Sequence, residues 1–225
     1  MQTLHIRADS VTGYHGSIVL LPGTHQRLED FLTAGFDVAA RQRRLPLDLI
    51  LAAPALTHLT DRAWLVPLLR EVIEPRRAAG QPLWLGGISL GAFRALRFAA
   101  EHPTLVDGLC LLAPYLGSRI VAAEIARCDS IRGWDPGRLS DDDDERRVWC
   151  YLRDLQSPPP QLFVGLSRED RFADTQRLLA RVLPTASRCE IEGRHDWPAW
   201  QCLWRHFLDR YLQGAYATAA EVPTP

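Results

Sequence analysis

Short apolar runs bounded by turn residues recur along the chain and alternate with longer segments of helical periodicity. Runs of this kind are typical of strands buried inside a sheet. They cover residues 17–21, 47–51, 83–85, 106–112, 162–165 and 188–191, and residues 3–7 add an edge strand. The alternation predicts an α/β fold with a mainly parallel sheet of about seven strands, right-handed crossovers and helices on both faces.

Two of the connecting segments have clear helical patterns. Residues 25–44 read as a helix with a break near Gly35. Residues 61–74 place their apolar side chains on one helical face. We expect Pro75 to kink or end this second helix, because proline lacks the backbone donor and its ring clashes with the preceding turn.

The segment 115–160 is too long for a single crossover. It contains a helical stretch at 118–127, a Gly-Trp-Asp-Pro-Gly turn, four aspartates at 141–144 and a second helical stretch that reaches Leu155. We therefore expect one domain over residues 1–225 with a small helical cap inserted at 115–160. Residues 214–225 are small and end in proline, which predicts a flexible tail.

The four consecutive aspartates allow two interpretations. A metal site is one, but hard cations need ligands spaced around a loop. Acidic residues at a helix N-terminus complement the helix dipole and remain solvated, and this second interpretation is favoured.

Composition narrows the functional classes without selecting one. The 225 residues are 47% hydrophobic and 24% charged with a formal net charge of −1, so no general attraction to nucleic acid follows. All 26 basic residues are arginine, which excludes a catalytic or Schiff-base lysine. The five cysteines lack metal-ligand spacing, and we expect a reduced, cytoplasmic setting. No signal peptide is visible, and no apolar run reaches the roughly 18 residues of a membrane span.

The run at 83–85 leads into the most informative stretch of the chain. Residues 87–91 read Gly-Ile-Ser-Leu-Gly, which fits G-x-S-x-G, and residues 92–100 continue as a helix. Strand, tight turn and helix are the setting in which this pattern forms a nucleophile elbow, with glycines where side chains would strike a neighbouring element. The pattern predicts Ser89 as a nucleophile, and a chance match within an ordinary strand–helix turn is the alternative.

A serine hydroxyl needs a base within hydrogen-bond reach to act as a nucleophile. Among the seven histidines, His195 follows the last strand and precedes a helix that starts near Asp196. It therefore lies at the edge of the sheet that presents Ser89, where ligands bind in open α/β sheets. Asp196 itself has the position of a helix N-cap.

The third group of such a site is an acid that orients the imidazole and stabilises its charged form. The loop after the strand at 162–165 supplies two candidates, Asp170 and its neighbour Glu169. Asp170 is the preferred acid and Glu169 the alternative. Either carboxylate could instead cap the helix that starts near Ala173.

The order Ser89, Asp170, His195 across successive strand ends resembles the α/β-hydrolase superfamily, whose order is nucleophile, acid, base. The resemblance covers residues 17–212. The closing run Gly-Arg-His-Asp-Trp-Pro-Ala-Trp is similar to the end of bacterial esterases of that superfamily. Two positions depart from the usual pattern: Ala92 replaces a second glycine, and Pro22-Gly23 replaces His-Gly in the oxyanion loop.

The resemblance implies an oxyanion hole formed by the backbone N–H groups of Leu90 and Thr24, and no metal or organic cofactor. Four further side chains are candidates for substrate contact, although core or loop packing is the alternative for each. These are His25, His58, Tyr115 and Trp149.

The resulting hypothesis is a serine hydrolase that cleaves small-molecule carboxylic esters through an acyl-enzyme intermediate. A thioesterase is the close alternative, and halide-dependent peroxidation a weaker one. A non-catalytic ligand-binding protein on the same fold belongs to a different functional class. The sequence leaves the acyl length and the oligomeric state open.

Overall fold

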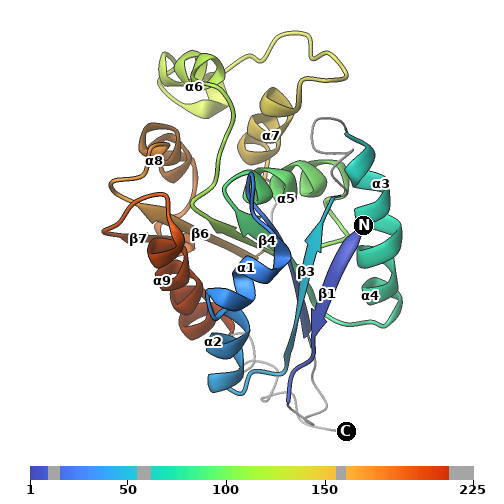
Figure 1. The fold of residues 1–225 in the computed structure, drawn as a ribbon. Helices are drawn as coiled ribbons and strands as arrows, with labels where there is room; N and C mark the ends of the chain where they lie inside the picture. The colour runs from blue at the N-terminus through green and yellow to red at the C-terminus, as the bar shows by residue number, and fades with distance from the viewer. Residues whose placement is uncertain (10–15, 55–61, 156–160, 213–225) are drawn as a thin grey trace, which may run out of the picture.

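The computed structural model describes residues 1–9, 16–54, 62–155 and 161–212 (Figure 1). Its centre is a seven-stranded sheet with the order β1-β3-β2-β4-β5-β6-β7. Only β1 runs antiparallel, against β3; each of the other neighbouring pairs is parallel. The strands are β1 (Gln2–Ile6), β2 (Gly16–Leu21), β3 (Leu47–Ala53), β4 (Leu83–Ile88), β5 (Gly108–Leu112), β6 (Gln161–Ser167) and β7 (Arg188–Ile191). The prediction of a mainly parallel sheet of about seven strands is confirmed.

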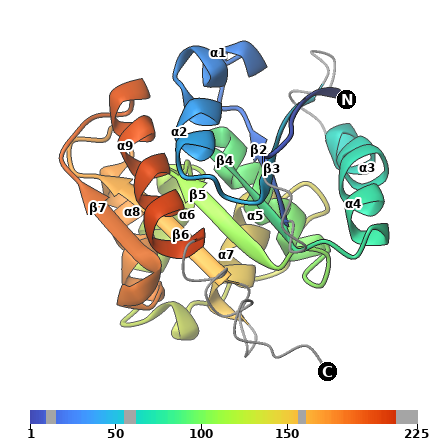
Figure 2. The same cartoon turned by 90° about the horizontal axis from the view of Figure 1, so that it is seen from below.

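Helices cover both faces of the sheet (Figure 2). Alternate residues of one strand enter opposite cores: Val19 and Leu21 pack on one face, and Ile18 and Leu20 on the other. On the first face lie α5 (Leu90–Glu101), α6 (Arg119–Ala126), α7 (Asp144–Arg153) and α8 (Ala173–Val182). On the second face lie α1 (Leu28–Thr33), α2 (Phe36–Gln42) and α9 (Trp197–Phe207). Gly35 separates α1 from α2 with a φ of 72°, as the expected break requires.

The helix at residues 62–78 does not end at Pro75. It continues through η2 (Arg62–Trp64), α3 (Leu65–Pro67), η3 (Leu68–Ile73) and α4 (Glu74–Ala78). In η3, a π-helix, the Glu74 N–H bonds to the Leu69 carbonyl, five residues back. This wider turn lies immediately before Pro75, which stands in the first turn of α4 and lacks the N–H that would bond to the preceding turn.

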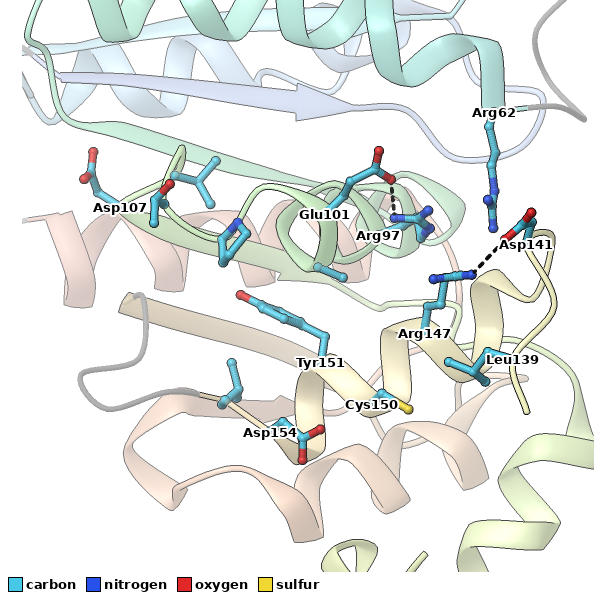
Figure 3. A pocket seen from close by; sticks show the side chains of 15 residues that line it. Arg62, Arg97, Glu101, Asp107, Leu139, Asp141, Arg147, Cys150, Tyr151 and Asp154 are labelled. Atoms are coloured by element: carbon cyan, nitrogen blue, oxygen red, sulfur yellow. Dashed lines mark ion pairs between the residues drawn. The ribbon is translucent and has the colours of Figure 1, made fainter. Parts of the chain in front are cut away.

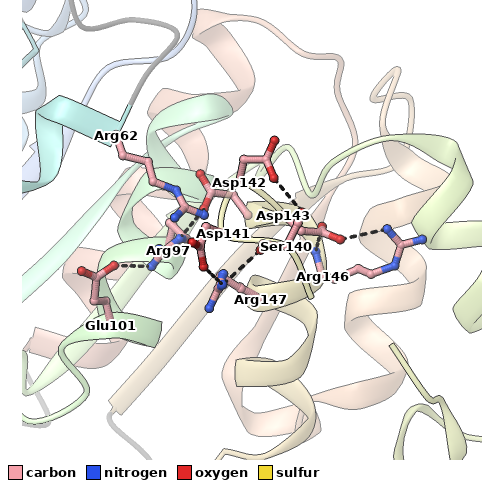
Figure 4. Close-up of polar contacts among 10 residues, drawn as sticks. Arg62, Arg97, Glu101, Ser140, Asp141, Asp142, Asp143, Arg146 and Arg147 are labelled. Carbon is pink, nitrogen blue, oxygen red and sulfur yellow. Dashed lines mark hydrogen bonds and ion pairs between the residues drawn. The ribbon is translucent and has the colours of Figure 1, made fainter. Parts of the chain in front are cut away.

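The segment between β5 and β6 carries α6, the short η4 (Ile131–Gly133) and α7. The aspartate run at 141–144 leads into α7, and Asp143 caps it by accepting the Arg146 N–H at 3.1 Å. Asp144 accepts hydrogen bonds from Arg62 at 2.5 Å and from Arg97 of α5 at 2.6 Å. The neighbouring Asp143 also pairs with Arg146 (Figure 4). The placement at a helix N-terminus is confirmed, but Asp144 is ion-paired rather than freely solvated. These pairs tie α7 to the helix that follows Ser89.

Within the described residues no helix is long and apolar enough to cross a membrane. Nor does any group of three or more His, Cys, Asp or Glu side chains there form a cluster that could hold a metal ion. The expected tail at 214–225 and the candidate His58 lie outside the described residues.

Candidate active site

Ser89 occupies a strained turn between β4 and α5. Its φ of 54° and ψ of −115° are unusual for a residue with a side chain, and such conformations cost about 1–3 kcal/mol. The flanking glycines permit the turn. A Cβ on Gly91 would lie 2.0 Å from the Leu21 carbonyl oxygen, and one on Gly87 would lie 2.4 Å from the same atom. Any side chain at these positions would push the end of β2 away from the turn.

The structure brings Ser89, His195 and Asp170 into one hydrogen-bonded series. Ser89 Oγ lies 2.9 Å from His195 Nε2, and Asp170 Oδ2 lies 2.7 Å from His195 Nδ1. The three residues follow the carboxyl ends of β4, β7 and β6 respectively. Glu169, the alternative acid, points away: its half-exposed carboxylate lies 3.4 Å from the Arg194 guanidinium. The geometry therefore favours Asp170 over Glu169.

Asp170 is buried and held by groups other than the histidine. The Phe172 backbone N–H donates to Asp170 Oδ1 at 2.7 Å. Burial raises the pKa of Asp170, but hydrogen bonds from His195, the Phe172 N–H and the Gln176 side chain outweigh it and keep that pKa below its ordinary value. Gln176 is only 1% exposed and also bonds to the Pro114 carbonyl. The carboxylate is consequently ionised and fixed in orientation.

Two aromatic rings hold the His195 imidazole edge-on. The Phe172 ring lies 5.0 Å from it and the Trp200 ring 5.1 Å, both at an interplanar angle of 87°. Asp196 caps α9 by accepting the Ala199 N–H at 3.3 Å, as predicted for an N-cap. Sequence reasoning did not find Phe172, Gln176 or Trp200, since their role lies in contacts between segments and no local motif indicates it.

The two predicted oxyanion donors, the backbone N–H groups of Leu90 and Thr24, lie at the start of α5 and in the loop after β2. Leu90 is the first residue of α5, so its N–H is one of those without a partner inside the helix. Thr24 is exposed in the loop after β2, which packs tightly on the start of α5 at Gly91. In that loop the Gln26 side chain accepts the Gly23 N–H at 2.7 Å and braces the backbone. The oxyanion role of Leu90 and Thr24 stays a prediction.

Of the four candidates for substrate contact, Tyr115 lies next to the nucleophile. Its backbone N–H bonds to the Ser89 carbonyl at 3.2 Å, and its ring packs 5.3 Å from Phe172. His25 is exposed beside Thr24 with a φ of 62°. Among the described residues, His25 forms no hydrogen bond or ring contact with Ser89, Asp170 or His195.

Trp149 is a core residue, which corrects its assignment as a substrate contact. It is 0% exposed, and its Nε1 donates to the Leu116 carbonyl at 3.1 Å. Val121, Ile125 and Leu152 of the same insertion are buried in the same core. Ile120 is the exception at 70% exposure. The helices of the insertion use their apolar faces to pack on the domain, so these residues do not line a substrate cavity.

Two of the cavities beside the insertion differ in their relation to Ser89. One, of about 860 Å³, lies between α5 and α7 and is lined by Arg97, Glu101, Arg147 and Tyr151 but by no residue of the triad (Figure 3). The other, of about 800 Å³, lies between α6 and α8 and includes Tyr115 and Phe172. Of these two, the second shares Phe172 with the surroundings of His195.

Comparison with solved structures identifies the fold. FphF, a fluorophosphonate-binding serine hydrolase of Staphylococcus aureus in a substrate-bound structure, matches with a TM-score of 0.65 and 13% identity, covering 92% of this chain and 87% of that one. S-formylglutathione hydrolase (FrmB) of the same organism matches at 0.62 and 13%, covering 92% and 84%. Est1E from Butyrivibrio proteoclasticus matches at 0.57 and 15%, covering 97% and 93%. No family model and no curated protein sequence matches the chain.

The chain has the α/β-hydrolase fold. The sheet order, the elbow turn and the strand-end positions of Ser89, Asp170 and His195 agree with the resemblance stated from the sequence.

Proposed function

We propose that the protein is a serine hydrolase that cleaves carboxylic esters or thioesters through Ser89, His195 and Asp170. The observation that carries the proposal is the continuous series of two hydrogen bonds, 2.9 and 2.7 Å long, that ends on the strained turn at Ser89. A chance G-x-S-x-G match would not bring a histidine and a buried carboxylate into this order. Several structures with the same fold are described as serine hydrolases and esterases, which supports the class of reaction.

The mechanism follows from the positions of the three side chains. Ser89 Oγ attacks the carbonyl carbon of the substrate while its proton passes to His195 Nε2. The carbonyl oxygen becomes an oxyanion, and the N–H groups of Leu90 and Thr24 are the donors we assign to it. When the carbonyl re-forms, the bond to the leaving group breaks, and His195 Nε2 gives its proton to the departing oxygen or sulfur.

The second half of the reaction releases the acyl group. Water gives a proton to His195 Nε2 and attacks the acyl carbon, and the proton then returns to Ser89 Oγ as the carboxylic acid leaves. Asp170 stays ionised throughout and stabilises the imidazolium of both steps, which agrees with its lowered pKa.

Fluorophosphonate labelling tests this proposal. The wild-type protein should be labelled at Ser89 and hydrolyse 4-nitrophenyl acetate, whereas Ser89→Ala should lose both properties, with turnover falling on the order of 10⁶-fold. Ser140→Ala is the matched control, because Ser140 is an exposed serine that contacts Asp142 and not His195. Labelling or hydrolysis retained in folded Ser89→Ala protein would reject the mechanism. A wild-type protein that binds ligands but is never labelled would support the non-catalytic alternative.

A further inference from the structure

The cavity between α6 and α8 carries a local excess of positive charge. Its charged lining consists of four arginines, Arg119, Arg171, Arg177 and Arg181, against the single carboxylate of Asp174. The chain as a whole has a net charge of −1, so this excess does not follow from composition. Arg119 comes from α6, Arg177 and Arg181 from α8, and Arg171 from the loop that also carries Asp170.

The carboxylate neutralises only one of the four guanidinium groups. Asp174 pairs with Arg177 at 2.8 Å. Within the part of the chain that the structure describes, Arg119, Arg171 and Arg181 form no ion pair. Three guanidinium groups on three separate segments therefore face one cavity without a carboxylate partner, which is the arrangement that binds carboxylate or phosphate oxygens.

The arginine groove, as we call this cavity, adjoins the proposed catalytic histidine. The Arg171 guanidinium lies 4.9 Å from the centre of the Phe172 ring, and that ring lies 5.0 Å from the His195 ring. Together these distances place the Arg171 charge within about 10 Å of the imidazole. The groove thus shares the Phe172 ring with the surroundings of His195, the residue that protonates the leaving group in the proposed mechanism.

A second depression next to Tyr115 has the opposite charge. It measures about 470 Å³ and is lined by Phe93, Ser140 and the acidic residues 142–145. Arginines pair with Asp143 and Asp144, so among the described residues Asp142 and Glu145 remain without an ion pair. These two carboxylates repel an anion, whereas the arginine groove attracts one. Tyr115 lines both cavities, so it separates a basic side of the site from an acidic side.

We infer that the arginine groove binds the leaving group of the substrate, and that this leaving group is an alcohol or thiol bearing a carboxylate or phosphate. The inference rests on the proposed hydrolase function and names the substrate class of that site. The apolar side chains of Ala122, Ala126 and Leu178 between the arginines would contact the carbon skeleton of the leaving group.

The test compares two acetate esters of the same shape. 4-Acetoxybenzoate has an anionic leaving group, and 4-acetoxybenzamide is its neutral counterpart; 4-acetoxyphenyl phosphate adds a phosphate arm. In wild-type protein kcat/KM should favour both anionic esters over the amide by about tenfold, and 0.5 M NaCl should reduce that preference. The triple variant Arg119→Gln/Arg171→Gln/Arg181→Gln should bring the ratio close to one while hydrolysis of the neutral ester persists. Whichever anionic ester is preferred identifies the anion.

Arg127→Gln is the matched control, because Arg127 is an exposed arginine at the end of α6 outside the groove. Single variants replace the triple variant if it fails to fold. Phenyl hydrogen succinate and phenyl succinamate place the same charge difference on the acyl side. A charge preference confined to this acyl pair would overturn the leaving-group assignment, as would an equal preference in wild-type and triple-variant protein. Fluorophosphonate labelling separates the two proposals: labelled protein without charge preference refutes the groove alone, and unlabelled protein refutes both.

Discussion

Replacing Asp170 by asparagine tests the orientation of the catalytic histidine. The Phe172 N–H donates to Asp170 Oδ1, so in the variant the amide oxygen must take that position. The amide NH₂ then faces His195 Nδ1, where the carboxylate oxygen lies at 2.7 Å. An NH₂ group needs an acceptor there, which moves the ring proton to Nε2. With a proton on Nε2, His195 cannot accept the Ser89 proton.

The expected loss is large because the wrong tautomer removes the base altogether. The equivalent change in a serine protease lowers turnover about 10⁴-fold, which corresponds to roughly 5 kcal/mol of transition-state stabilisation. The fold should survive, since asparagine has the shape of aspartate. Loss of the charge-assisted hydrogen bonds should cost about 1.5–3 kcal/mol, or a few degrees in Tm.

Glu169→Gln is the control for this experiment. It changes a carboxylate one residue earlier that points towards Arg194, and activity should stay within about twofold of wild type because surface ion pairs contribute little. The measurements are kcat/KM for 4-nitrophenyl acetate and thermal unfolding of both variants. Asp170→Asn protein with activity within tenfold of wild type would refute the reasoning, and so would an equal loss in Glu169→Gln.

Two further predictions concern the insertion. Trp149→Ala should lower the free energy of unfolding by about 3–5 kcal/mol, because the ring is fully buried, and should leave the preference among 4-nitrophenyl esters of different acyl length unchanged. Ile120→Ala, on the exposed side of α6, is the control and should change neither the stability nor this preference. An altered acyl preference at unchanged Tm in Trp149→Ala would contradict the core assignment. Burial raises the pKa of Tyr151 to about 12, so the unfolded chain ionises this phenol near pH 10 while the folded chain does not. Stability should fall between pH 10 and 12 by on the order of 1–2 kcal/mol, and urea unfolding of Tyr151→Phe should show less of this alkaline loss.

The elements and the chemical groups of the site could be predicted because each has a local signature. The apolar runs that became β2 to β7 lie between turn residues, and the pattern at residues 87–91 has one common structural meaning. The positions of Asp170 and His195 follow from the rule that parallel strands end at one edge of the sheet. Choosing between Asp170 and Glu169 needed the direction of each side chain, which the structure supplies.

The supporting contacts could not be predicted, because no local motif indicates them. Gln176 bonds to the Pro114 carbonyl, 62 residues earlier in the chain, and the Trp200 ring of α9 packs on His195 in the loop before that helix. The sequence leaves Trp149 open between substrate contact and core packing, because a helical apolar face has the same pattern whether it meets substrate or protein. Pro75 was expected to disturb its helix, and no sequence rule indicates the π-helix that precedes it.

The arginine groove lies between α6 and α8, and only one of these two helices also supports the triad. This difference decides which helix can be changed to redesign the substrate preference. The α8 wall also carries Gln176, which supports Asp170, so changes there put the chemistry at risk. Among the described residues, none of α6 forms a hydrogen bond with Ser89, His195 or Asp170. New selectivity can therefore be sought in a library confined to the exposed positions Arg119, Ala123 and Ala126, with the reaction machinery left intact.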